Sequence, residues 1–290
     1  MIFNVVSIIA PIFLIVMFGY IYAKFEQPDM QIINRMILRL LVPALIFSVM
    51  SAKDFQMAIY ADLALAALGV ILSSGLVAYI MSRLMGFKWS TFVPPMMFSN
   101  WGNIGIPLIV FTFGQDALNA AVILFIVGNI VHFTVGIVLM SGRFDLKEFV
   151  TTPVIIAFFL GLLVNNVAMP IPDFVIKPID MMGQASIPLM LVSLGVRLQS
   201  VQWNDMKIAF VAAVLGPIIG VLVAYSFANL IELNEIQTKQ LLLFGALPPA
   251  VMNYMFAEQY DLEPEKVASI VLLSNLLSVV TYFILLFYIL

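Results

Sequence analysis

The sequence predicts an all-α polytopic membrane protein of ten transmembrane helices, built as two inverted five-helix repeats. Three observations carry this prediction. Of the 290 residues, 63% are apolar and only 10% are charged, the apolar residues fall into ten runs, and the two halves of the chain match at a nearly constant offset. Because about 20 apolar residues cross the hydrocarbon core as one helix, ten spans need about 200 residues and leave about 90 for connections.

Charge and cysteine content exclude several classes of protein. The 13 Lys and Arg residues stand against 16 Asp and Glu residues, a net charge of -3, so the chain offers no basic face to a nucleic acid. Cysteine is absent from the sequence, which excludes disulfides, thiolate catalysis and zinc-thiolate sites. No stretch between the apolar runs is long enough for a separate domain, so we expect the function to lie within the membrane.

Charged residues and turn signals bound the ten apolar runs. The runs cover residues 2–23, 32–50, 58–82, 91–113, 119–140, 150–167, 175–196, 208–230, 239–257 and 266–289. The first basic residue is Lys24, so the first run lacks the basic segment that begins a cleaved signal peptide, and we expect it to be a retained span. Ten spans place both termini on the same side of the membrane.

Basic residues predict which side that is, because cytoplasmic flanks retain Lys and Arg during insertion. If both termini face outward, only Lys53, Lys177 and Lys239 of the 13 basic residues lie outside. The inner flanks then hold Lys24, Arg35, Arg39, Arg83, Lys88, Arg143, Lys147, Arg197, Lys207 and Lys266. The sequence therefore predicts an N-out and C-out orientation.

The chain contains an internal repeat. The matched pairs are Pro43–Ser48 with Pro188–Ser193, Leu76–Tyr79 with Leu222–Tyr225, Asp116 with Asp261 and Asn129 with Asn275, all at offsets of 145 or 146. We therefore expect a first repeat over residues 1–149 and a second over 150–290. Each repeat has five spans, and an odd number inverts the second repeat relative to the first, as in many secondary transporters.

The fourth and ninth runs carry residues that interrupt helices at membrane depth. The crossover residues are Gly102, Gly105 and Pro107 in the fourth run and Pro248 and Pro249 in the ninth. Proline removes a backbone donor and clashes with the preceding turn, while glycine permits unwinding. At the offset of 145, Asn103 aligns with Pro248, so we expect both halves to break at corresponding positions. Free backbone groups are tolerated there only if they are buried in protein or line a cavity.

Three asparagines beside these interruptions are the candidate substrate ligands: Asn100, Asn103 and Asn253. The N-termini of half-helices give a positive potential without a formal charge, which favours an anionic group. The asparagine amides add donors for a carboxylate, or carbonyl oxygens for a cation. The alternative is that these side chains only cap the freed backbone groups.

Other polar residues within the runs have weaker claims. His132, the only histidine, lies in the fifth run and is a candidate for a proton relay or for an interhelical hydrogen bond. Asn129 and Asn275 are candidates for coupling or support, with interhelical bonding as the alternative. Asp180 lies near the end of a run, where we expect solvation at the interface. We expect no metal site and no cofactor.

Four motifs resemble those of the auxin efflux carrier family of membrane permeases. They are Leu41–Phe47, Asn100–Pro107 with Phe113 and Gly114, Ile187–Gly195, and Pro248–Asn253 with Ala257–Tyr260. The resemblance implies a fold like that of bile-acid sodium symporters, in which broken helices 4 and 9 cross. It also implies a scaffold domain of helices 1, 2, 6 and 7, a transport domain of helices 3–5 and 8–10, elevator-type alternating access and a homodimer.

The same resemblance implies the substrate class. Plant members carry an indole carboxylate, and bacterial relatives are associated with malate, malonate and similar acids. This chain lacks the long loop between helices 5 and 6 of many plant carriers, so a bacterial-type permease of the inner membrane is the better comparison. The three asparagines are then substrate contacts, and helices 2 and 7 line the site near Phe47 and Ser193. The Asp and Lys pair on helix 3 of plant carriers has no counterpart, since no lysine follows Asp62 within its run.

The predicted function is a secondary transporter of small organic anions, driven by the membrane potential or by a proton or sodium gradient. An enzyme is disfavoured, because the chain has neither an HExxH motif nor a GxSxG elbow. An ion channel, or a transporter of a solute without a carboxylate, remains the alternative. Neutral amides and backbone dipoles fix neither the substrate nor the direction nor the coupling ion.

Overall fold

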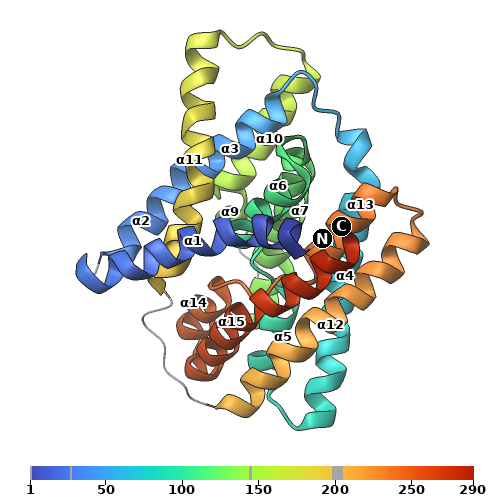
Figure 1. Cartoon of the computed structure of the whole chain (residues 1–290). Helices are drawn as coiled ribbons and strands as arrows, with labels where there is room; N and C mark the ends of the chain where they lie inside the picture. The colour runs from blue at the N-terminus through green and yellow to red at the C-terminus, as the bar shows by residue number, and fades with distance from the viewer. Residues whose placement is uncertain (1, 27, 144–145, 198–204) are drawn as a thin grey trace.

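The computed structural model describes residues 2–26, 28–143, 146–197 and 205–290, and these residues are helical apart from short connections (Figure 1). The α-helices are α1 (Ile2–Glu26), α2 (Met30–Met36), α3 (Val42–Ser51), α4 (Met57–Met85), α5 (Trp89–Met97), α6 (Ile106–Phe113), α7 (Leu118–Val131), α8 (Ile137–Ser141), α9 (Leu146–Val150), α10 (Pro153–Asn166), α11 (Asp173–Arg197), α12 (Met206–Leu230), α13 (Glu235–Gly245), α14 (Met252–Gln259) and α15 (Pro264–Ile289). Three π-helical turns, η1 (Ile37–Leu41), η2 (Trp101–Gly105) and η4 (His132–Gly136), and one 3-10 turn, η3 (Gln115–Ala117), join some of them.

Seven of the described helical stretches are long and apolar enough to cross a membrane, so the chain is a polytopic membrane protein. They cover residues 5–26, 32–51, 57–85, 115–141, 173–196, 206–230 and 264–289, and each coincides with a predicted run. The predicted run 150–167 contains the shorter α10, which measures about 21 Å at about 1.5 Å per residue. The predicted runs 91–113 and 239–257 each contain two short helices with an interruption between them. Ten crossings therefore remain a prediction.

One group of helices consists of α1, α3, α10 and α11. In this group α1 packs on α11, α10 packs on α3, and α3 packs on α11. Glycines allow the closest approach: a Cβ atom added at Gly19 would collide with the backbone of Val192, and one added at Gly195 would collide with the backbone of Val16. Small residues at helix contacts are typical of membrane proteins, because dispersion contacts must replace the hydrophobic effect there.

A second group contains α4, α5, α7, α12, α13 and α15. Here α4 packs on α5 and α7, while α12 packs on α13 and α15, and α4 and α12 pack on each other. The contact between α12 and α13 is made by Gly220 and Gly245, where a Cβ atom on either residue would collide with the backbone of the other. Helix α4 therefore contacts the next two helical stretches of its half of the chain, and α12 does the same in the second half.

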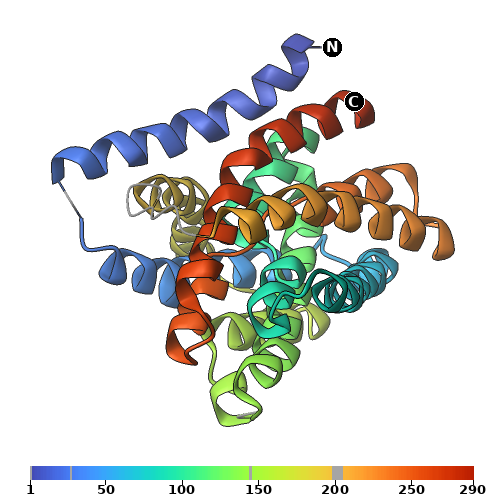
Figure 2. The same ribbon diagram turned by 90° about the horizontal axis from the view of Figure 1, so that it is seen from below.

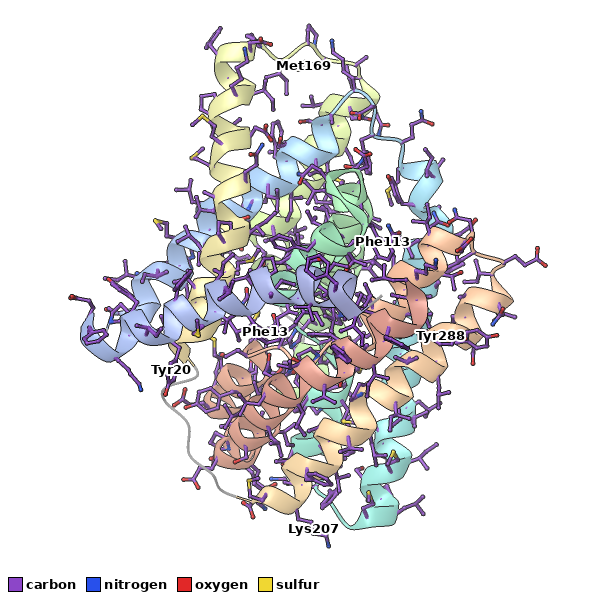
Figure 3. All side chains as sticks on the ribbon, in the orientation of Figure 1. Phe13, Tyr20, Phe113, Met169, Lys207 and Tyr288 are labelled. Atoms are coloured by element: carbon purple, nitrogen blue, oxygen red, sulfur yellow. The ribbon has the colours of Figure 1, made fainter. Side chains whose placement is uncertain are left out.

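The two chain termini lie near each other in both ribbon views, on the α1 and α15 helices, which are in contact (Figures 1 and 2). Figure 3 shows Met169, in the connection before α11, and Lys207, near the start of α12, at opposite ends of the view. The distribution of basic residues predicts opposite sides of the membrane for these two positions.

Asp180 differs from its predicted role. Its carboxylate accepts a hydrogen bond from the Ser48 hydroxyl at 2.8 Å and another from the Gln184 amide at 3.1 Å. The side chain is half-buried, so it links α11 to α3 instead of being only solvated. Sequence reasoning could not find this link, because Ser48 and Asp180 are 132 residues apart.

Candidate functional site

Two helices, α5 and α13, end inside the predicted runs 91–113 and 239–257. Helix α5 carries Pro94 and Pro95 in its last turn and ends at Met97, and the backbone is extended at Phe98 (φ -109°, ψ 99°). Helix α13 ends at Gly245, just before Pro248 and Pro249. A proline at 248 or 249 lacks the N–H that would bond to the carbonyl four residues earlier, which favours an interruption at these two adjacent positions.

The two interrupted segments pair with each other. The Asn100 N–H donates to the Pro248 carbonyl at 2.7 Å, and the Ala250 N–H donates to the Phe98 carbonyl at 3.0 Å. These bonds form an antiparallel bridge between Ser99 and Pro249. The two interrupted segments thus lie side by side, although the bridged residues are 150 positions apart in the chain.

Asn253 fastens this pairing. Its side-chain amide is 1% exposed and donates to the Phe98 carbonyl at 2.8 Å and to the Ala250 carbonyl at 2.9 Å. Asn275 acts similarly from α15, since its amide donates to the Pro249 carbonyl at 3.1 Å and to the Val271 carbonyl at 2.7 Å. Asn253 therefore caps freed backbone carbonyls, which is the alternative that sequence reasoning held open for it, and Asn275 bonds from α15 to the second interrupted segment.

The pairing leaves polar atoms without partners. Among the described residues, the Asn100 Nδ2, the Asn253 Oδ1 and the Asn275 Oδ1 are buried and make no hydrogen bond. One of these atoms is a donor and two are acceptors. A buried polar atom without a partner costs about 1–3 kcal/mol, so such atoms mark where a bound group or water completes the structure.

Asn103 occupies a different environment. It lies in η2, is half-buried, and its side chain makes no hydrogen bond within the described part of the chain. Its neighbours fix the path of η2: a Cβ atom on Gly102 would lie 2.9 Å from the Phe125 ring, and one on Gly105 would lie 2.9 Å from the Leu247 side chain. Pro107 lies in the first turn of α6, where proline is tolerated.

Of the two helices predicted to line the site, the one that contains Ser193 lies beside the first interrupted segment. Helix α11 packs against η2, and the sulfur of Met190 would lie 3.8 Å from a Cβ atom on Gly102. Ser193, one turn further along α11, donates its hydroxyl to the Asn34 side chain at 2.7 Å. Phe47 is partly buried against the main core. The hydrogen bond of Ser193 thus runs to Asn34 and not to the paired asparagines, and the roles of Ser193 and Phe47 at the site stay predictions.

His132 and Asn129 lie on the helical stretch of α7, η4 and α8. The His132 ring stacks on the Phe98 ring with centroids 4.2 Å apart and planes 3° apart. Its Nε2 is buried and has no partner among the described residues. Asn129 donates to the Phe125 carbonyl, four residues earlier, at 2.8 Å. That bond lies within one helix, and it has the same spacing as the bond from Asn275 to Val271.

A small cavity of about 30 Å³ lies on one side of the pairing. Its lining includes Ser99, Pro248 and Pro249 together with Ser74 of α4 and Ser274 of α15. The hydroxyls of Ser74 and Ser274 are buried and have no partner among the described residues. This volume holds a water molecule, which needs about 10–15 Å³. Sequence reasoning missed both serines, because a serine in an apolar run usually bonds to the carbonyl four residues earlier.

No charged residue lies between positions 89 and 115 or between 240 and 257. Within the described ranges, no group of three or more His, Asp or Glu side chains is arranged to hold a metal ion. The paired segments therefore present backbone dipoles and amide groups to a ligand. The half-helices that follow the interruptions, η2 with α6 and then α14, direct their N-termini toward the pairing, and such ends attract negative charge.

Known proteins share this organisation of the sequence. The profile of a family described as "Membrane transport protein" matches residues 4–149 and, in a second match, residues 139–286. An uncharacterized transporter of Methanocaldococcus jannaschii is 24% identical over 300 residues, which cover 95% of this chain and 94% of the relative. An uncharacterized transporter of Methanothermobacter thermautotrophicus is 25% identical and covers 93% of each chain. A protein of Rhizobium meliloti named "Putative malonate transporter" is 24% identical over 304 residues, with 96% of this chain and 93% of the relative covered.

Proposed function

Because this chain belongs to the membrane transport protein family, the auxin efflux carriers that its motifs resemble, we propose that it is a secondary transporter of small organic anions such as malonate or malate. Membership in a family of transporters favours transport over catalysis. The malonate in the name of the Rhizobium meliloti relative supports a short dicarboxylate as the first substrate to test.

One observation carries the proposal: the pairing of two interrupted helices leaves buried asparagine atoms without partners in a region that has no charged residue. The Asn100 Nδ2 supplies a donor for a carboxylate, and the half-helix N-termini supply positive potential. A carboxylate therefore accepts the hydrogen bond that the Asn100 Nδ2 leaves unmade, whereas the Asn253 Oδ1 and the Asn275 Oδ1 are acceptors and need a donor such as a water molecule. Asn103, which has a half-buried side chain without a bond, adds a second amide donor on the same segment.

We propose alternating access for the transport step. The group of α1, α3, α10 and α11 would act as the scaffold, and the helices around the pairing would move with the substrate. The reciprocal packing of α1 on α11 and of α10 on α3 supports an inverted repeat. In this proposal the chain is a homodimer in the inner membrane, with both termini outside.

The driving force depends on direction. Export of one negative charge at about 100 mV, inside negative, releases about 2.3 kcal/mol, so efflux can proceed without a coupled ion. Uptake of the same anion must instead be coupled to protons or to sodium. The proposal includes no other cofactor.

Uptake of labelled malonate into proteoliposomes tests the function, with the potential and the proton and sodium gradients imposed one at a time. We expect saturable uptake that is lost in Asn103→Ala. Asn229→Ala is the matched control, because Asn229 is an exposed asparagine of α12 that bonds only to the Tyr225 carbonyl at 2.8 Å. Unsaturable flux would favour a channel, and no uptake of any mono- or dicarboxylate under any gradient would refute the substrate class.

A further inference from the structure

The only histidine of the chain lies inside the aromatic cluster that surrounds the paired segments. The His132 ring stacks on Phe98 at 4.2 Å and meets the Phe256 ring edge-on at 5.4 Å between centroids. Phe98 belongs to the first interrupted segment, and Phe256 belongs to α14, the half-helix that follows the second. His132 therefore contacts both halves of the candidate substrate site.

The backbone is adapted to hold this ring. His132 opens the π-helical turn η4, which widens the helix at that point, and such turns are frequent at functional sites. Gly136 leaves the space for the stack, since a Cβ atom there would lie 2.9 Å from both the His132 and the Phe98 rings. A phenylalanine would fill the same space without leaving a buried Nε2 unpartnered, so packing alone does not account for a histidine.

The candidate substrate site lies next to Phe98. The Phe98 carbonyl accepts the Asn253 amide at 2.8 Å, and the Asn100 Nδ2, two residues along the segment, is buried without a partner. The unpartnered imidazole nitrogen and the unpartnered amide thus flank one residue. A carboxylate bound at the pairing would lie beside the imidazole.

No counter-ion for an imidazolium is present on the helices that contact His132. Helix α5 and the stretch of α7, η4 and α8 contain no other titratable side chain. Helix α14 contains Tyr254 and Glu258, which bond to each other at 3.3 Å in an exposed position. A charged imidazole buried among aromatic rings is costly unless an opposite charge accompanies it.

We propose that His132 carries the proton that is co-transported with the anion, an inference that rests on the proposed function. The anion supplies the counter-ion that the protein lacks, so Nε2 binds a proton when a carboxylate occupies the site. Both leave together on the other side, one proton for each anion, and the imidazole returns neutral. The transporter is then a proton symporter, in which His132 holds the proton only while the anion is bound.

Accumulation of labelled malonate tests this coupling. The proteoliposomes are set at about pH 8 inside and about pH 7 outside, with the potential clamped at zero by potassium and valinomycin. One proton per anion predicts about tenfold accumulation for one pH unit. In His132→Gln we expect no accumulation, while exchange of labelled for unlabelled malonate persists and shows that the variant is folded. Thr134→Ser, a change of similar size in η4 that keeps the hydroxyl bonded to the Ile130 carbonyl, serves as the control and should accumulate normally.

A second readout does not depend on the variant. With one histidine in the chain, nitrogen NMR of the ¹⁵N-histidine-labelled protein reports one imidazole, and we expect the neutral form without malonate and the imidazolium when malonate is added at the same pH. The same form in both samples, or accumulation by His132→Gln equal to the wild type, would overturn the inference. Wild-type uptake that responds to the potential but not to the pH difference overturns the inference alone. Absence of wild-type uptake under every gradient overturns the proposed function as well.

Discussion

The replacement of Asn253 by alanine separates the structural role of this residue from that of Asn103. The Asn253 amide donates two hydrogen bonds, to the carbonyls of Phe98 and Ala250. Both carbonyls keep a backbone donor in the variant, from the N–H groups of Ala250 and Asn253 respectively. The loss is therefore two net hydrogen bonds of about 1 kcal/mol each, or about 2 kcal/mol in total.

Asn103→Ala is the matched comparison, since it makes the same asparagine-to-alanine change in η2. The Asn103 side chain makes no hydrogen bond within the described residues, so its removal should change stability by less than about 0.5 kcal/mol. We expect both variants to lose malonate transport, but only Asn253→Ala to lose stability.

Thermal unfolding in detergent, read from tryptophan fluorescence, measures the difference. A loss of about 2 kcal/mol lowers the melting temperature by about 4–8 °C at a slope of about 2–4 °C per kcal/mol. Melting temperatures that agree within about 1 °C between Asn253→Ala and the wild type would show that Asn253 does not fasten the paired segments. A large decrease for Asn103→Ala would show that its side chain has a structural partner, and its assignment as a free ligand would then be wrong.

Two further predictions concern other parts of the same helices. Gly220→Ala places a Cβ atom against the Gly245 carbonyl at the end of α13, so we expect poor yield and a lowered melting temperature. Gly216→Ala is the control, because its Cβ atom would only reach the Met96 sulfur at 3.5 Å. Its melting temperature should be well above that of Gly220→Ala. Glu263 accepts hydrogen bonds from Lys266 and Thr91, which hold the pKa of its carboxyl below the ordinary value. Its contribution to stability is therefore present above about pH 4.5 and lost as the pH falls through the lowered pKa. In Glu263→Gln the melting temperature should depend less on pH across that window, and an unchanged dependence would contradict the assignment.

The sequence predicts the helices well because long apolar runs and proline have strong local effects. Seven predicted runs coincide with helices long enough to span a membrane, since length and apolarity alone decide such an element. The interruptions were also predictable, because Pro248 and Pro249 remove donors wherever the helix lies. The family resemblance, carried by motifs such as Asn100–Pro107, is confirmed by the profile match over residues 4–149 and 139–286.

The contacts between residues far apart in the chain were harder to predict from the sequence. The repeat offset of 145 or 146 comes from whole helices, whereas the antiparallel bridge joins Ser99 to Pro249. Extended segments pair by local hydrogen-bond geometry, which a helix-based offset does not contain. The stack of His132 on Phe98 was equally invisible, because it depends on the π-helical turn and on a glycine one turn later.

The positions of the buried polar atoms that lack a hydrogen-bond partner connect these contacts to the candidate site. Elsewhere in the described helices, hydroxyls such as those of Thr112 and Ser226 donate to the carbonyl four residues earlier. Several polar side chains in apolar surroundings are thus satisfied within their own helix. Seven buried polar atoms have no partner among the described residues, and five of them belong to residues at the interruptions, in their cavity or in their aromatic cluster. The sixth is the Oδ1 of Asn275, whose amide bonds to the Pro249 carbonyl, and the seventh is the Tyr282 hydroxyl.

Chance would not concentrate these atoms where two helices break, because each one costs about 1–3 kcal/mol and could be replaced by an apolar side chain. A transporter must bind its substrate and release it, so its site has to exist both filled and empty. Amide and imidazole groups meet this requirement better than a fixed positive charge, which would hold an anion in a low-dielectric site and bury an unpaired charge once the anion had left. An uncharged site with unmade hydrogen bonds therefore fits the proposed reversible binding of an anion inside a membrane.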